Sequence, residues 1–229
     1  MMRILAIIST HGNESLGPSL LAYMLAKRSK LLENMEFIIA NPRAYAKNVR
    51  YTESDLNRSY GLGLDTYESQ RAKVIEERIR LLKPELVLDF HTTTAEQPNI
   101  LITADKNNEV VQRFINASAI KDNLVVSPLN DITTVVSNFV AYEVPNSHLN
   151  DDLYEQICTD IARYLDEEAV DQERTFYKMT GKILPEEEKD TVGLKNFVYN
   201  DTLQTIPAFL GEEAYKHDGT YAGFRLKVL

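Results

Sequence analysis

Short apolar runs alternate with longer amphipathic stretches over about the first 165 residues of the chain. The run at residues 3–9 (RILAIIS) is almost wholly apolar and rich in Ile, which is typical of a strand buried on both faces of a parallel sheet. Similar runs predict strands at residues 36–40, 85–90, 99–103, 123–126 and 139–143, and amphipathic stretches predict helices at 18–32, 65–82, 108–120 and 150–165. A stretch without such a pattern, residues 41–63, is expected to be irregular.

The order of these elements predicts an α/β fold with a mixed, mainly parallel sheet and helices on both faces. The helix at 65–82 is expected to begin with a capping box, because Asp65 and Glu68 stand three residues apart. After residue 165 the pattern changes to short β-rich runs, at 175–179 and 221–228, separated by Gly, Pro and Asp. We therefore expect a catalytic domain at 1–168 and a small β-rich C-terminal domain at 169–229.

Composition narrows the class of protein. With 44% hydrophobic residues in 229, the chain can bury a large core, and its net charge of -9 argues against a nucleic-acid partner. No stretch approaches the roughly 20 apolar residues of a membrane span, and the first residues lack the blocks of a signal peptide, so we expect a cytoplasmic protein with no membrane partner. One cysteine, Cys158, excludes an internal disulfide and a multi-cysteine zinc site.

Metal-binding and acid/base residues follow three of the predicted strands. His11 and Glu14 come after the first in the turn HGNE, His91 follows residues 85–90, and Glu143 ends residues 139–143 just before Pro145. HGNE alone is a weak signal, because a His in a turn is more often a surface residue than a ligand. Ligands of open α/β sheets nevertheless gather beyond the carboxyl ends of strands, so the three segments together predict one site.

The irregular stretch 41–63 carries NPRAY and RYTESDLNRSY. So many Arg, Asn and Asp residues are, one by one, best explained as a solvated loop held by turns. Beside a metal site, however, an arginine can grip a substrate carboxylate or stabilise an oxyanion, which makes Arg50, Asn57 and Arg58 candidates for recognition.

The segments HGNE, NPRA, DLNR, DFHTTT and YEVPN resemble, in order and spacing, the aspartoacylase and succinylglutamate desuccinylase family, zinc amidohydrolases with a carboxypeptidase-like zinc domain. The resemblance implies one Zn²⁺ per chain, held by His11, Glu14 and His91, with Glu143 as the catalytic carboxylate. It also implies an arginine that polarises the substrate carbonyl, substrate contacts from DLNR, and a substrate-contacting tyrosine in GEEAY that brings the C-terminal domain to the mouth of the site. The residues at these last positions are Arg50, Asn57, Arg58 and Tyr215.

Zinc held by two His and one Glu keeps a coordination position open for water. Glu143 would take the proton from that water and pass it to the leaving amine, while zinc and Arg50 stabilise the oxyanion. Asp89 stands two residues before His91 on a strand, hence on the same face, where it either orients that imidazole or bonds to the backbone.

The leading hypothesis is thus a zinc-dependent hydrolase that cleaves the non-peptide amide of an N-acylated acidic amino acid or a related small carboxylate. Aspartoacylases resemble one another in an arginine ten residues before the catalytic Glu, and Thr133 stands at that position here, which weakens the case for N-acetylaspartate. Two alternatives stay open: a carboxypeptidase-like peptidase acting on short peptides, and a metal-dependent binding module without turnover. A homo-oligomer is compatible with all three.

Overall fold

One sheet runs through the part of the chain that the computed structural model describes, residues 4–218 and 221–229. Its strand order is β2-β1-β3-β6-β4-β5-β7-β9-β8, with parallel pairing between β2 and β1, β1 and β3, β3 and β6, β4 and β5, and β5 and β7, and antiparallel pairing elsewhere. The strands are β1 (Ile4–Ile8), β2 (Met35–Ile39), β3 (Leu86–Thr93), β4 (Ile100–Thr103), β5 (Asp122–Val125), β6 (Phe139–Pro145), β7 (Thr175–Ile183), β8 (Ile206–Ala208) and β9 (Gly223–Val228). The prediction of a mixed, mainly parallel sheet is confirmed.

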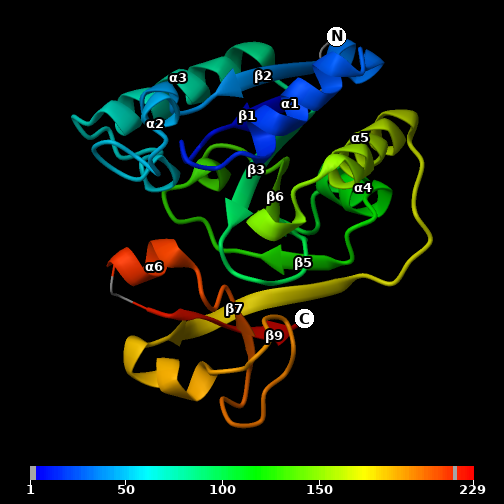
Figure 1. The fold of residues 1–229 in the computed structure, drawn as a ribbon. Coiled ribbons are helices and arrows are strands. Elements are labelled where there is room, and N and C mark those ends of the chain that lie inside the picture. The colour runs from blue at the N-terminus through cyan, green and yellow to red at the C-terminus, as the bar shows by residue number, and fades with distance from the viewer. Residues whose placement is uncertain (1–3, 219–220) are drawn as a thin grey trace.

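Helices cover both faces of this sheet (Figure 1). The helices are α1 (Leu16–Ala26), α2 (Pro42–Lys47), α3 (Tyr67–Leu82), α4 (Glu109–Ala117), α5 (Asp151–Asp166) and α6 (Glu213–Asp218). Alternate residues of β1 divide between two cores, because successive side chains of a strand point to opposite faces. Ile4, Ala6 and Ile8 pack with α1, α4 and α5, whereas Leu5 and Ile7 pack with α3.

Several predicted boundaries move in the structure. The helix expected at 18–32 ends at Ala26, after which the chain turns through a short 3-10 helix, Lys30–Asn34. The capping box of Asp65 and Glu68 is wrong: Thr66 is the N-cap of α3, and its side chain accepts a hydrogen bond from the backbone N–H of Ser69 at 3.2 Å. The strand expected at 85–90 continues to Thr93, because it stays paired with β6 from Val87 to Thr93.

The stretch predicted to be irregular, 41–63, is only partly so. It contains α2 and the 3-10 turn Leu56–Arg58, and each begins at a residue whose side chain accepts from the backbone two or three residues on, Asn41 and Asp55. The loop between them is held by the buried carboxylate of Glu68, which accepts hydrogen bonds from the backbone N–H groups of Thr52, Glu53 and Ser54. Its polar residues are therefore ordered.

The C-terminal strands extend the same sheet. The proposed boundary at residue 168 falls between α5 and β7, and β7 then pairs with β5 in parallel, while β9 and β8 follow at the edge. Figure 1 shows these strands at the end of the molecule opposite β2. A separate core of Ile100, Leu124, Tyr177, Ala208, Phe209 and Leu226 spans the junction. A domain division at 168 stays a prediction.

Within the described residues, no helix has both the length and the apolar character needed to cross a membrane. The expected cytoplasmic location and a homo-oligomeric state stay predictions.

Candidate metal centre and active site

The turn after β1 approaches α2 closely. A Cβ on Gly12 would lie 2.1 Å from the backbone carbon of Ala44 and 2.3 Å from the backbone nitrogen of Tyr45, so only glycine fits. The Gly12 N–H also donates to the carbonyl of Arg50 at 3.1 Å. These contacts join the segments HGNE and NPRAY, far apart in sequence, and place Arg50 beside the turn that carries His11 and Glu14.

Three buried side chains converge at the ends of β1 and β3. His11 Nδ1 lies 2.5 Å from one carboxylate oxygen of Glu14, and His91 Nδ1 lies 2.9 Å from the other. One donor atom from each residue lies within 4.8 Å of the others, and the three residues are between 3% and 6% exposed. The predicted ligands thus form a buried cluster that could hold a metal ion.

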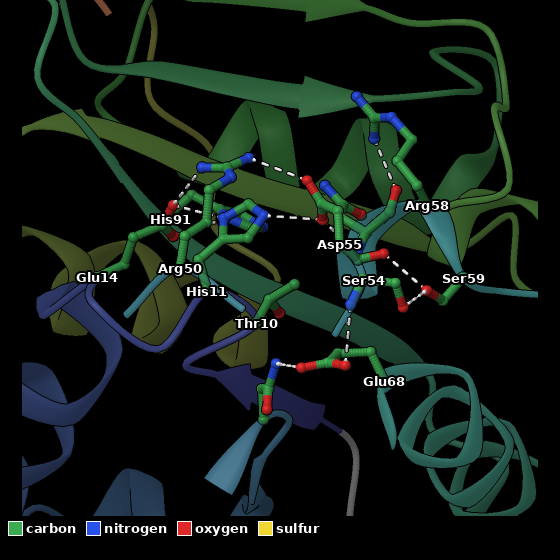
Figure 2. Close-up of polar contacts among 12 residues, drawn as sticks. Thr10, His11, Glu14, Arg50, Ser54, Asp55, Arg58, Ser59, Glu68 and His91 are labelled. Carbon is green, nitrogen blue, oxygen red and sulfur yellow. Dashed lines mark hydrogen bonds and ion pairs between the residues drawn. The ribbon is translucent and has the colours of Figure 1, made fainter. Parts of the chain in front are cut away.

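The remaining ring nitrogen of each histidine faces a second carboxylate. His11 Nε2 lies 3.2 Å from Asp55 (Figure 2), and His91 Nε2 lies 2.9 Å from Asp89. Asp89 also accepts from the Thr10 hydroxyl at 3.0 Å and from the Phe90 N–H at 2.9 Å, so both roles considered for it from sequence occur together. Since an outer carboxylate orients a ligating imidazole and raises its basicity, each histidine presents Nδ1 to the centre.

The ionisation of each residue in the cluster depends on the charges of the others. Burial disfavours ionised histidine, but the carboxylates around His11 and His91 outweigh it and raise both pKa values, Glu14 acting on each. Burial likewise opposes the charge of Glu14, yet the two imidazoles hold its pKa well below the ordinary range. The cluster therefore favours an anionic carboxylate facing cationic partners, and a metal ion could replace the protons of the imidazoles.

Arg50 lies at the edge of this cluster. One terminal nitrogen donates to Asp55 at 3.3 Å and the other lies 3.7 Å from Glu14, so the guanidinium is fixed while a third of its side chain stays exposed. Arg58 follows in the turn of DLNR and donates to the carbonyl of Asn57 (Figure 2). Arg50, Asn57 and Arg58 all line one cavity with the cluster.

Glu143 lies in β6 opposite His91 in β3, since the two are register partners. Burial raises its pKa to about 8, with the negative charges of Glu14 and Glu212 adding to the rise and His91 opposing it. A carboxyl with a pKa this near neutrality can both take and give a proton, although a metal ion beside it would lower the pKa again.

Tyr215, in α6, reaches the same cavity from the C-terminal end of the chain. Glu212, just before α6, ties this segment to the end of β3: its carboxylate accepts from the Thr93 hydroxyl and, at 2.8 Å, from the Thr94 N–H. The Glu213 N–H donates in turn to the Thr94 hydroxyl at 2.7 Å.

The cavity measures about 450 Å³ and brings together all the predicted site residues. They are His11, Glu14, Arg50, Asn57, Arg58, His91, Glu143 and Tyr215. Their catalytic and binding roles stay proposals.

Sequence reasoning missed three acidic residues of the cavity, namely Asp55, Asp131 and Glu212. Asp55 could have been noticed in the sequence, because it is the first residue of the motif DLNR. Its contact with His11, however, joins residues that are 44 positions apart. Asp131 could not have been noticed in this way: it caps the turn Ile132–Thr134 through the Thr133 N–H at 2.9 Å, an ordinary role for an Asp in a loop.

Known relatives match this chain over part of its length. A probable aspartoacylase of Prochlorococcus marinus (strain MIT 9515) is 38% identical over 111 residues, covering 44% of this chain and 37% of that protein. An N-acyl-aromatic-L-amino acid amidohydrolase (carboxylate-forming) of Xenopus tropicalis is 34% identical over 106 residues, covering 41% and 34%. The chain thus matches little more than a third of the length of these relatives.

The crystal structure of murine aminoacylase 3 has the same fold, with a TM-score of 0.71 at 22% identity over 100% of this chain and 95% of that one. The family model of the succinylglutamate desuccinylase/aspartoacylase catalytic domain matches residues 3–145, which hold the buried cluster, Arg50, DLNR and Glu143. The chain therefore belongs to the succinylglutamate desuccinylase/aspartoacylase family.

Proposed function

We propose that this protein is a zinc-dependent amidohydrolase that removes the acyl group from an N-acyl amino acid. The observation that carries the proposal is the buried cluster of His11, Glu14 and His91, in which both imidazoles turn Nδ1 toward one carboxylate while Glu143 and Arg50 line the same cavity. Membership of the family supports the reaction type.

The donor set fits zinc. Two imidazoles and one carboxylate are a common catalytic zinc set, and both outer nitrogens already have carboxylate partners. Bound there, zinc would supply a Lewis acid that polarises a carbonyl and acidifies water.

The residues of the chain then position the substrate and transfer protons. Glu143 takes the proton of the attacking water and delivers it to the amine nitrogen as the carbon–nitrogen bond breaks. Arg50, held by Asp55 and Glu14, places positive charge beside the carbonyl oxygen as it becomes anionic. Arg58 and Asn57 bind the substrate carboxylate, and Tyr215 contacts the substrate from the C-terminal side of the cavity.

The test is metal analysis of the purified protein followed by a screen of N-acyl amino acids and short peptides for release of amine. We expect one zinc per chain and release of amine from N-acyl amino acids, which chelation abolishes and added zinc restores. Full activity after complete removal of metal would contradict the requirement for zinc. Release of amine from peptides alone would indicate a peptidase.

Glu143→Gln separates an enzyme from a binding module. Because Gln cannot accept the proton of water, kcat should fall by about 10²–10⁴-fold while metal content and substrate binding persist. Glu155→Gln, at an exposed residue of α5 that hydrogen bonds Tyr23, is the control and should leave kcat unchanged. Parental activity in Glu143→Gln would refute the role of this residue.

A further inference from the structure

We propose that the acyl group of the substrate is an unbranched, medium-chain fatty acyl group, which extends from the scissile carbonyl along an apolar strip of the sheet. The inference rests on the proposed function and assigns the acyl half of the substrate. It follows from the register of four neighbouring strands, β6, β4, β5 and β7, and from the side chains that they present to the cavity.

The strip, which we call the apolar floor, begins beside Glu143. Glu143 and Ala141 are alternate residues of β6, so their side chains point to the same face of the sheet. Ala141 is the register partner of Ile102 in β4, and Ile102 is the partner of Leu124 in β5. A row of apolar side chains therefore leads away from the proposed base, from one strand to the next.

The row continues to β7. Leu124 pairs with Tyr177, and Val126 and Met179 follow two residues later on the same face. Leu124 and Tyr177 are buried, whereas Val126 and Met179 line the cavity. Since neighbouring strands lie about 4.8 Å apart, the three steps from β6 to β7 span about 14 Å, enough for an extended octanoyl chain. The cavity-lining residues of the apolar floor are Ala141, Ile102, Val126 and Met179.

The amino acid half of the substrate points the other way. Leu56 of DLNR packs in the same core as Leu5 and Ile7 of β1, and β1 lies on the other side of β6 from β4. Arg58, two residues after Leu56, thus lies on the β1 side of Glu143. A trans amide directs its two substituents to opposite sides of the carbon–nitrogen bond, so a substrate held at Arg58 by its carboxylate extends its acyl group toward β4 and β7.

The apolar floor suits an alkyl chain better than a charged acyl group. Its four lining residues are all apolar, so a succinyl group would place its second carboxylate there without a cation to offset the loss of hydration. An alkyl chain leaves water without losing any polar contact. Met179 is unbranched and flexible, which lets it adapt to chains of different length.

The size of the cavity agrees with a longer acyl group. Its volume of about 450 Å³ lies in the range of about 300–1,000 Å³ that is typical of sites for drug-sized ligands. An acetyl group at the carbonyl position would leave most of the apolar floor in contact with water.

The test varies the acyl group on one amino acid. The amino acid is the one that the zinc-loaded protein releases fastest from a set of N-acetyl and N-hexanoyl amino acids. Its N-acetyl, N-butanoyl, N-hexanoyl, N-octanoyl and N-succinyl derivatives are then compared by kcat/KM. We expect kcat/KM to rise about three- to fourfold for each added methylene group up to hexanoyl, because each is removed from water. The N-succinyl derivative should be at least about tenfold slower than the uncharged N-butanoyl derivative.

The outcomes separate this inference from the proposed function. If kcat/KM stays constant or falls as the acyl chain lengthens, or if the N-succinyl derivative is the fastest, the acyl assignment is wrong and the proposed function stands. If no N-acyl amino acid is hydrolysed, the proposed function itself is refuted.

Two variants test whether the apolar floor is the cause. Val126→Asn places an amide on the floor, and Met179→Gln does so at its far end while keeping an unbranched side chain. In each, the ratio of kcat/KM for the N-octanoyl derivative to that for the N-butanoyl derivative should fall by about tenfold. Val125→Asn is the matched control, because Val125 is also partly exposed but points to the opposite face of β5, away from the cavity. An unchanged ratio in both floor variants, or an equal fall in the control, would contradict the inference.

Discussion

The two sides of the cavity are built in different ways. On one side lies what we call the strand-end cluster, which consists of His11, Glu14 and His91 with the carboxylates of Asp55 and Asp89. In this cluster both ring nitrogens of each imidazole lie close to a carboxylate oxygen. On the other side lie four rings that we call the aromatic wall, namely Phe209, Tyr215, Tyr221 and Phe224. This wall is held by ring packing and by apolar contacts around β7 and β9. Charge-assisted hydrogen bonds fix atoms in direction, whereas ring packing fixes mainly shape.

This difference suggests a division of labour. The strand-end cluster sits in segments whose strands are buried on both faces, so its geometry is rigidly supported, as the proposed metal site requires. The aromatic wall belongs to the edge of the sheet and is tied to the end of β3 through Glu212. Reaction chemistry and substrate preference should therefore respond to different substitutions.

The largest separable effect is expected from Asp89→Asn. Loss of this charge weakens the orientation and basicity of His91, so zinc affinity should fall about 10–100-fold while the preference among substrates stays as in the parent. Competition with a chelator measures the affinity. Asp160→Asn is the matched control, because Asp160 is equally buried and bonded to Ser118, on the α4–α5 side of the sheet. An equal loss of affinity in both variants would mean that general destabilisation, and no specific contact, is responsible.

A smaller effect, on substrate binding and not on zinc affinity, is expected from Glu212→Gln. The neutral amide accepts weaker hydrogen bonds from the Thr93 hydroxyl and the Thr94 N–H, and bonds to a charged acceptor contribute about 1.5–3 kcal/mol. The segment that carries Tyr215 should loosen, raising KM for the N-acyl amino acid substrate by up to about tenfold while zinc affinity is unchanged.

Steady-state kinetics and chelator competition on the same preparation give both quantities. Glu213→Gln is the control, because the hydrogen bond of Glu213 to Thr94 comes from its backbone N–H and survives the substitution. A fall in zinc affinity in Glu212→Gln would show that the two sides of the cavity are not independent.

The same contrast explains what the sequence could predict. Strands buried on both faces carry a strong apolar signal, and residues at their ends are placed by the sheet, which is why His11, Glu14, His91 and Glu143 could be brought together in advance. Asp55 could not be assigned to His11, because that contact depends on how a loop folds back across 44 positions. The capping box predicted at Asp65 is wrong for a related reason. The Glu68 carboxylate accepts a hydrogen bond from Thr52 in the loop, and Thr66 is the N-cap of the helix.

Glu68→Gln tests the loop that supports the strand-end cluster, and its effect should be the smallest. Burial alone would raise the pKa of Glu68, but hydrogen bonds from Thr52, Asn41 and Ser54 outweigh it and hold the pKa below its ordinary value. A carboxylate whose pKa is lowered by folding stabilises the protein above its unfolded pKa of about 4.3, and this contribution is lost as the pH falls through the folded pKa. The Gln variant lacks that dependence.

The measured quantity is the difference in the free energy of unfolding between the parent and Glu68→Gln, obtained by urea denaturation between pH 7 and pH 4. It should be about 1–3 kcal/mol at pH 7, where the charged acceptor is present, and should narrow toward the acid end of the range as Glu68 begins to take up a proton. Glu77→Gln, on the exposed face of the same helix and paired with Arg80, should change the stability far less, because exposed ion pairs contribute little. A difference that stays constant with pH would mean that the shape of the side chain, and not its charge, holds the loop beneath Asp55.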